Sequence, residues 1–174
     1  MVGWHALTEP LTMGSQVATR RELMAALTRA LAPGSDERLL AVVRLHGLHD
    51  LRERVGQDEE DRLLSVAQGR LLLEVGSAGR VYLPRRDELC VLFECRFETA
   101  IQLLDNVTAA LNELAPGCRV RAEAGVALLP DEAADPISAL ERADRRILPG
   151  EDSGRGVAAR SERRKLAQEI HLAS

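Results

Sequence analysis

Aromatic residues are scarce in this chain of 174 residues, where they make up 2% of the sequence. A protein that binds single-stranded nucleic acid by stacking its bases needs aromatic side chains, so their scarcity argues against that function. The net charge of −4 argues against a protein that binds the phosphate backbone of nucleic acid. We therefore expect an aliphatic core and no nucleic-acid partner.

Paired cysteines and long apolar runs are also missing. The three cysteines include no Cys-x-x-Cys pair, which indicates a reducing compartment and gives no signal for structural zinc. No apolar run approaches the roughly 18 residues of a membrane-spanning helix, and no basic segment precedes an apolar one as in a signal peptide. We therefore expect a soluble cytoplasmic protein with no membrane partner.

What is present is typical of a globular domain, with 45% hydrophobic and 29% charged residues. Apolar spacing and capping signals predict helices at residues 19–31, 50–73, 97–114 and 135–147, the second interrupted near Gly56. Short apolar runs predict strands at 39–43, 80–84, 90–95 and 120–129. This order favours an α+β fold, in which helices pack on a mainly antiparallel sheet. We predict a lead-in at 1–17, a domain at 18–156 and a helical tail at 157–174.

The segment Arg85–Leu89 lies between two of these apolar runs and predicts the tip of a β-hairpin. It carries two adjacent carboxylates, Asp87 and Glu88, which are suited to holding Mg²⁺ over a triphosphate. Arg85 and Arg86 precede them, although a turn that approaches a ligand closely usually has glycine there. The arginines either bind phosphate or are solvated charges left after a site was lost.

Several segments, in order, resemble a GGDEF domain, the catalytic module of bacterial diguanylate cyclases, over about residues 8–156. They are Glu9–Thr12 with Arg20 and Arg21, Val42–Leu48, Gly56 with Asp61–Leu64, Arg85–Leu89, Ala124–Pro130 and Ala143–Arg145. The resemblance implies a palm-like fold, similar to that of polymerases and nucleotidyl cyclases, with a central sheet of about five strands. It also implies an activity: two facing domains each bind GTP, and metal ions assist its conversion to cyclic-di-GMP.

The chain departs from the family where the metal should bind. The aspartate that ends the family's first strand is replaced by Arg44, whose guanidinium has donors only and cannot bind a cation. The next acidic position is His46, and imidazole is a poor ligand for Mg²⁺. Asp87 and Glu88 remain. We therefore expect no metal, and we predict that Arg44 forms an ion pair with Asp87 or Glu88 in place of the cation.

The positions that would hold nucleotide are only partly kept. The resemblance puts the guanine-reading aspartate at Asp61 and the guanine-reading asparagine at Arg52. The phosphate-binding lysine and arginine fall at Glu151 and Arg155. The product-inhibition motif Arg-x-x-Asp falls at Gly76–Gly79, where neither functional residue occurs. We expect no cyclic dinucleotide at that second site.

The leading hypothesis is a degenerate GGDEF domain, a pseudoenzyme with no catalytic residue and no cofactor. It would regulate bacterial cyclic-di-GMP signalling through protein–protein interaction with an unnamed partner, and a homodimer is left open. The alternative is a sensor that binds GTP or another purine nucleotide through Asp61, Arg85, Arg86 and Arg155 without turnover, with Mg²⁺ bound only in that case. An active diguanylate cyclase and a transition-metal site at His46-x-x-His49 are the remaining alternatives.

Overall fold

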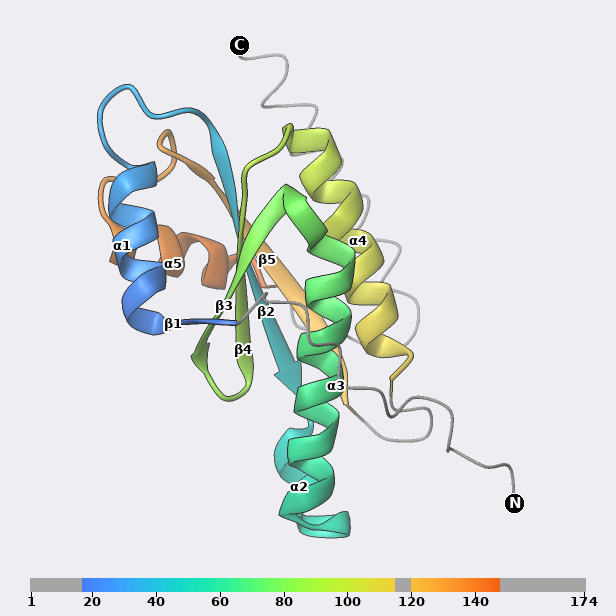
Figure 1. Ribbon diagram of the computed structural model, residues 1–174. Coiled ribbons are helices and arrows are strands. Elements are labelled where there is room, and N and C mark those ends of the chain that lie inside the picture. Colours follow the sequence, from blue (N-terminus) through green and yellow to red (C-terminus); the bar gives the residue numbers. More distant parts are fainter. Residues whose placement is uncertain (1–16, 115–119, 148–174) are drawn as a thin grey trace.

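The computed structural model describes residues 17–114 and 120–147, which form an open sheet with helices on both faces (Figure 1). In chain order the elements are β1 (Ala18–Thr19), α1 (Arg20–Ala30), β2 (Arg38–His46), α2 (Leu48–Val55), α3 (Gln57–Val75), the 3₁₀ turn η1 (Gly76–Ala78), β3 (Gly79–Arg85), β4 (Glu88–Phe93), α4 (Phe97–Asn112), β5 (Arg121–Leu129) and α5 (Pro136–Arg145).

The five strands run in the order β1-β3-β4-β2-β5. The short strand β1 is parallel to β3, and all other neighbours are antiparallel. Strand β2 is buried on both faces, so its sequence is a continuous apolar run rather than an alternating one. Odd-numbered residues of β2 such as Leu39 and Val43 join one core, while Leu40 and Val42 join the other.

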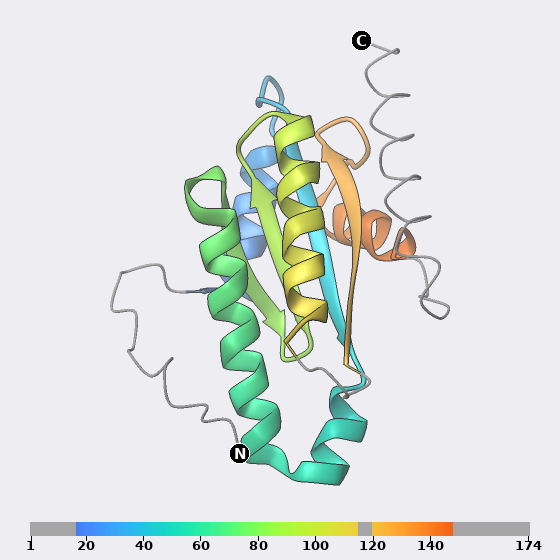
Figure 2. The ribbon, with the colours of Figure 1, turned by 90° about the vertical axis from the view of Figure 1, so that its right-hand side faces the viewer.

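Helices α3 and α4 cover the first face of the sheet, and α1 and α5 cover the second (Figures 1 and 2). The molecule therefore has two aliphatic cores, one on each face of the sheet. The only buried aromatic side chains among the described residues are Tyr82 in the α1/α5 core and Phe93 in the α3/α4 core. The predicted aliphatic core is therefore confirmed for the described part of the chain.

Local sequence signals set the helix boundaries. Thr19 caps α1 in a capping box with Glu22, and Asp135 caps α5 with Pro136 in the first helical position. Gly56 separates α2 from α3 because its φ of +94° lies in the left-handed region that favours glycine. The predicted helix at 50–73 is thus two helices, as its glycine indicated.

The predicted α+β fold with a mainly antiparallel sheet is confirmed. The two-residue strand β1 was missed, because a segment this short has no periodicity. The helical tail predicted at 157–174 lies outside the described residues, and the domain boundaries remain predictions. No helix in the ranges 17–114 and 120–147 has the length and apolar content needed to cross a membrane.

Candidate functional site

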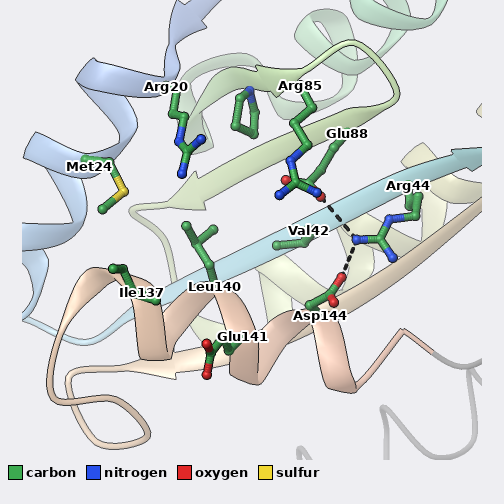
Figure 3. Close-up of a pocket in the computed structure, with 11 residues that line it drawn as sticks. Arg20, Met24, Val42, Arg44, Arg85, Glu88, Ile137, Leu140, Glu141 and Asp144 are labelled. Carbon is green, nitrogen blue, oxygen red and sulfur yellow. Dashed lines mark hydrogen bonds and ion pairs between the residues drawn. The ribbon is translucent and has the colours of Figure 1, made fainter.

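Arg44 lies on β2 where the apolar pattern of that strand ends. Its register partners are Glu88 on β4 and Glu123 on β5, and directly paired residues of antiparallel strands point to the same face. Arg44 Nη2 donates to Glu88 Oε2 at 3.2 Å and also to Asp144 Oδ1 on α5 (Figure 3). The expected ion pair between Arg44 and Glu88 is therefore present. Asp144 is a second partner that the sequence analysis did not predict.

This environment keeps the Arg44 guanidinium charged. Partial burial acts to lower the pKa of Arg44, but the hydrogen bonds and negative charges of Glu88 and Asp144 outweigh it and raise the pKa. The Glu88 side chain is only 12% exposed. A carboxylate this sheltered from water needs a cationic partner, and Arg44 supplies one.

Mg²⁺ does not fit this arrangement. Glu88 and Asp144 already accept hydrogen bonds from Arg44, which offers a cation no oxygen ligand. Within the described residues, no group of three or more His, Cys, Asp or Glu side chains is arranged to hold a metal ion. The two histidines also face different carboxylates: His46 Nε2 lies 3.1 Å from Glu123 Oε2, and His49 Nε2 lies 3.4 Å from Glu53 Oε1.

Asp144 on α5 reaches Arg44 because a glycine allows α5 to pack closely against the sheet. A Cβ atom added to Gly125 on β5 would lie 2.0 Å from the backbone oxygen of Ala143. Farther along, Arg146 donates to both carboxylate oxygens of Glu132 at 2.6 Å and to the Val126 carbonyl oxygen at 3.0 Å. The close approach and this bidentate ion pair hold the end of α5 against β5.

The hairpin itself corrects one prediction. Only Arg86 and Asp87 occupy the turn, because Arg85 and Glu88 already pair as the last residues of β3 and the first of β4. The two carboxylates therefore do not act together at a tip. Asp87 is exposed, and its side chain has no hydrogen bond or ion pair with any described residue, whereas its backbone oxygen accepts a hydrogen bond from Leu45 N at 2.9 Å.

Arg86 points to the opposite face and contacts the start of α3. Its Nε donates to Glu60 Oε1 at 3.3 Å, and its Nη2 donates to Asp61 Oδ1. Glu60 is buried, with a side chain 7% exposed, and its other carboxylate oxygen lies 3.9 Å from Arg52 Nε. The Glu60 hydrogen bond is the main reason that the pKa of Arg86 is raised. The side chain of Arg86 therefore covers the aspartate that the resemblance assigns to guanine recognition.

A pocket of about 310 Å³ opens on the other side of the hairpin, between α1, α5 and the ends of β2, β3 and β4 (Figure 3). Its lining comprises Arg20, Met24, Val42, Arg44, Pro84, Arg85, Glu88, Ile137, Leu140, Glu141 and Asp144. Arg20 and Arg85 reach into it from α1 and β3, and the ion pairs of Arg44 close one end. The side chains of the adjacent residues Arg85 and Arg86 thus lie on different faces of the sheet.

The predicted nucleotide-binding residues are therefore divided. Asp61 and Arg86 are together, but Arg85 lies in the pocket on the other face. Arg155 and Glu151 lie outside the described residues. Sequence reasoning missed Glu60 as a site residue, and the available signal was its place beside Asp61 at the start of a helix.

Comparison with known proteins supports the fold through structure rather than sequence. No family model and no curated protein matches the sequence. Among solved structures, the active GGEEF domain of a diguanylate cyclase from Vibrio cholerae superposes with a TM-score of 0.67 at 18% identity, over 76% of this chain and 89% of that chain. The FimX GGDEF domain from Pseudomonas aeruginosa gives 0.64 at 20% identity, over 85% and 91% of the two chains.

A third similar structure is the diguanylate cyclase SiaD in complex with its activator SiaC, also from Pseudomonas aeruginosa. It gives a TM-score of 0.65 at 20% identity, over 76% of this chain and 54% of SiaD. The recurrence of one architecture among these proteins agrees with the strand and helix order described above. The chain has the fold of a GGDEF domain.

Proposed function

We propose that this chain is a GGDEF-type domain that does not synthesise cyclic-di-GMP and instead regulates cyclic-di-GMP signalling in the bacterial cytoplasm by binding a protein partner. The observation that carries the proposal is the position of the Arg44 guanidinium, which donates to both Glu88 and Asp144. An arginine there takes up Glu88, one of the two hairpin carboxylates that the resemblance assigns to the cation, and phosphoryl transfer without that cation lacks its main source of charge stabilisation.

The opposite side of the hairpin supports the same conclusion. A guanine base read by Asp61 would have to displace the Arg86 guanidinium from both Asp61 and buried Glu60. Breaking contacts to a sheltered carboxylate costs free energy that the binding of the nucleotide would have to offset. The geometry therefore favours the regulator over the nucleotide sensor, for which calorimetry with GTP, with and without Mg²⁺, remains the direct test.

Partner binding is supported by analogy and by what the fold retains. SiaD, which shares the fold, forms a complex with an activator protein. The two aliphatic cores of this chain are well packed, so a domain with an unsuitable metal site still presents a defined surface. A scaffold that is kept while its metal site is filled by arginine is the arrangement expected of a binding module.

The test is incubation of the full chain with GTP and either Mg²⁺ or Mn²⁺, followed by chromatography for cyclic-di-GMP. The active GGEEF domain from Vibrio cholerae, treated identically, is the positive control. We expect no cyclic-di-GMP from this chain. Product formation that disappears in the variant Glu88→Gln would overturn the proposal, because it would show that the carboxylate still serves catalysis. Affinity capture from the native cell, with mass spectrometry, then identifies the partner.

A further inference from the structure

The pocket between α1, α5 and the hairpin contains two arginines that the proposed function does not use. Arg20 begins α1 and Arg85 ends β3, and both side chains point into the pocket (Figure 3). Within residues 17–114 and 120–147, neither arginine has a hydrogen-bond or ion-pair partner. Other arginines nearby are satisfied, since Arg44 binds Glu88 and Asp144. Two arginines that line one pocket, with no partner among the described residues, indicate a place for an anion.

The charges around the pocket indicate how much negative charge a ligand should carry. Three carboxylates also line it, but each has a cationic neighbour: Arg44 serves Glu88 and Asp144, and Arg145 lies 3.9 Å from Glu141. A dianion or a triphosphate would be repelled by these carboxylates. The lining carries three arginines and three carboxylates, and Arg145 beside Glu141 adds one positive charge, so a single negative charge between Arg20 and Arg85 balances the group and is repelled less than a dianion.

The remaining lining is apolar. Val42 and Pro84 form part of the wall, and Met24 from α1 faces Ile137 and Leu140 from α5. Ile137 is 60% exposed, so its apolar surface is open to a ligand in the pocket. An aliphatic chain in the pocket would cover it. The pocket volume of about 310 Å³ lies at the lower end of the range of small-molecule sites.

We propose that this pocket binds a short-chain aliphatic monocarboxylate, with the carboxylate between Arg20 and Arg85 and the chain against Met24, Ile137 and Leu140. Two guanidinium groups supply directional donors for a planar carboxylate. The aliphatic residues supply the apolar contact that separates such a ligand from an inorganic anion. This site goes beyond the proposed regulatory role and does not depend on it, because Arg20, Arg85 and the apolar side chains would hold the ligand, while the Arg44 ion pairs only border the pocket.

The test is a titration of the full chain with hexanoate, followed by methyl NMR of the isoleucine and methionine side chains. We expect the methyl signals of Ile137 and Met24 to shift in a saturable way. Ile101 lies in the core on the other face of the sheet and should not respond, which makes it an internal control. Butyrate should bind several-fold more weakly than hexanoate, because each buried methylene adds affinity.

Matched variants identify the carboxylate partners. Arg20→Gln and Arg85→Gln should each weaken hexanoate binding about ten-fold, the effect of losing one charge-assisted hydrogen bond. Arg21→Gln changes the neighbouring arginine of α1, which does not line the pocket, and should leave the affinity unchanged. Circular dichroism verifies that each variant remains folded, as expected for exposed side chains.

Three results would overturn the inference. The first is the absence of any shift of Ile137 and Met24 with hexanoate in the high-millimolar range. The second is an equal loss of affinity in Arg21→Gln, which would indicate a general charge effect. The third is tighter binding of inorganic phosphate than of hexanoate, which would show that the pocket selects a more highly charged anion without an apolar part.

Discussion

The adjacent arginines Arg85 and Arg86 have different surroundings on the two faces of the β3–β4 hairpin. On the α3 face, Arg86 forms ion pairs with Glu60 and Asp61, and Arg52 lies 3.9 Å from Glu60, so two cations stand beside two carboxylates. On the α5 face, Arg44 is shared by two carboxylates, while Arg85 beside it has no partner among the described residues and borders an open pocket. The carboxylates of the α3 face are occupied by arginines, whereas the α5 face has a pocket with room for a ligand.

Under the proposed function Arg44 takes the position of the cation, while the pocket beside it still has room for a ligand. The resemblance to GGDEF domains assigns guanine recognition to Asp61 and the cation to the position of Arg44. Here each face is independent, because the base position is covered by Arg86 and the cation position is filled by Arg44. The α5 face depends on the docking of α5 against the sheet, and the α3 face depends on the docking of α3 beside the hairpin turn. The following changes test that dependence.

The largest effect on stability is expected for Gly125→Val, which should distinguish the two faces most strongly. The new side chain would collide with the backbone of α5 and should lower the free energy of unfolding by about 3 kcal/mol or more. Urea unfolding measures it. The matched control is Gly69→Ala in α3, where an added Cβ meets nothing within 4 Å and should stabilise the helix by about 0.5–1 kcal/mol. Equal behaviour of both variants would contradict the close approach of α5.

Removal of the shared arginine should have the next largest effect. Arg44→Met leaves the sheltered Glu88 without its cation and should lower the free energy of unfolding by about 1–2 kcal/mol, less than a fully buried pair because Arg44 and Asp144 are partly exposed. Urea unfolding again gives the value. The double variant Arg44→Met with Glu88→Leu should recover most of the loss, and no recovery would argue that Glu88 does not need Arg44.

A smaller, pH-dependent effect is expected where α5 is anchored. Burial acts to raise the pKa of Glu132, but hydrogen bonds from Arg146 and from the Leu128 backbone, with the charge of Arg146, lower it overall. A carboxylate with a depressed folded-state pKa stabilises the fold above its ordinary pKa of 4.5, and that contribution is lost as the pH falls through the folded-state pKa. Glu132→Gln should therefore reduce stability at neutral pH by about 1 kcal/mol or less, and should match the parent chain at low pH.

The smallest stability change is expected on the α3 face. Arg86→Gln removes a half-exposed side chain whose ion pairs are screened by water, and Arg52 remains 3.9 Å from Glu60, whereas Arg44→Met leaves two carboxylates without their cation, so the urea midpoint should fall less than in Arg44→Met. The change should nevertheless uncover Asp61. Arg85→Gln is the control, since Arg85 has no partner within the described residues, and its midpoint should equal that of the parent. A larger fall for Arg86→Gln than for Arg44→Met would reverse the order of importance of the two faces.

Much of the fold could be predicted from the sequence because its signals are local. The capping residues Thr19 and Asp135, and the break at Gly56, mark helix boundaries through backbone chemistry that needs no tertiary contact. The double-sided burial of β2 follows from its unbroken apolar run. The pairing of Arg44 with Glu88 could also be predicted, because the resemblance placed both at one metal site.

The remaining site features depend on tertiary geometry. Asp144 is 100 residues from Arg44 along the chain, and it reaches the sheet only because Gly125 lets α5 approach. The separation of Arg85 from Arg86 depends on where the strand ends and the turn begins, and strand boundaries are difficult to place from sequence. The contact of Arg86 with Glu60 depends on the docking of α3. These contacts were not predicted because no local pattern encodes them.

The central claim is that the Arg44 guanidinium, and not a divalent cation, is the partner of Glu88 and Asp144. Electron paramagnetic resonance of added Mn²⁺ tests it most directly, because free and protein-bound Mn²⁺ have distinct signals. For the full chain we predict a spectrum of free Mn²⁺ that is the same for the parent and for Glu88→Gln. Stoichiometric Mn²⁺ binding by the parent chain that Glu88→Gln abolishes would contradict the claim.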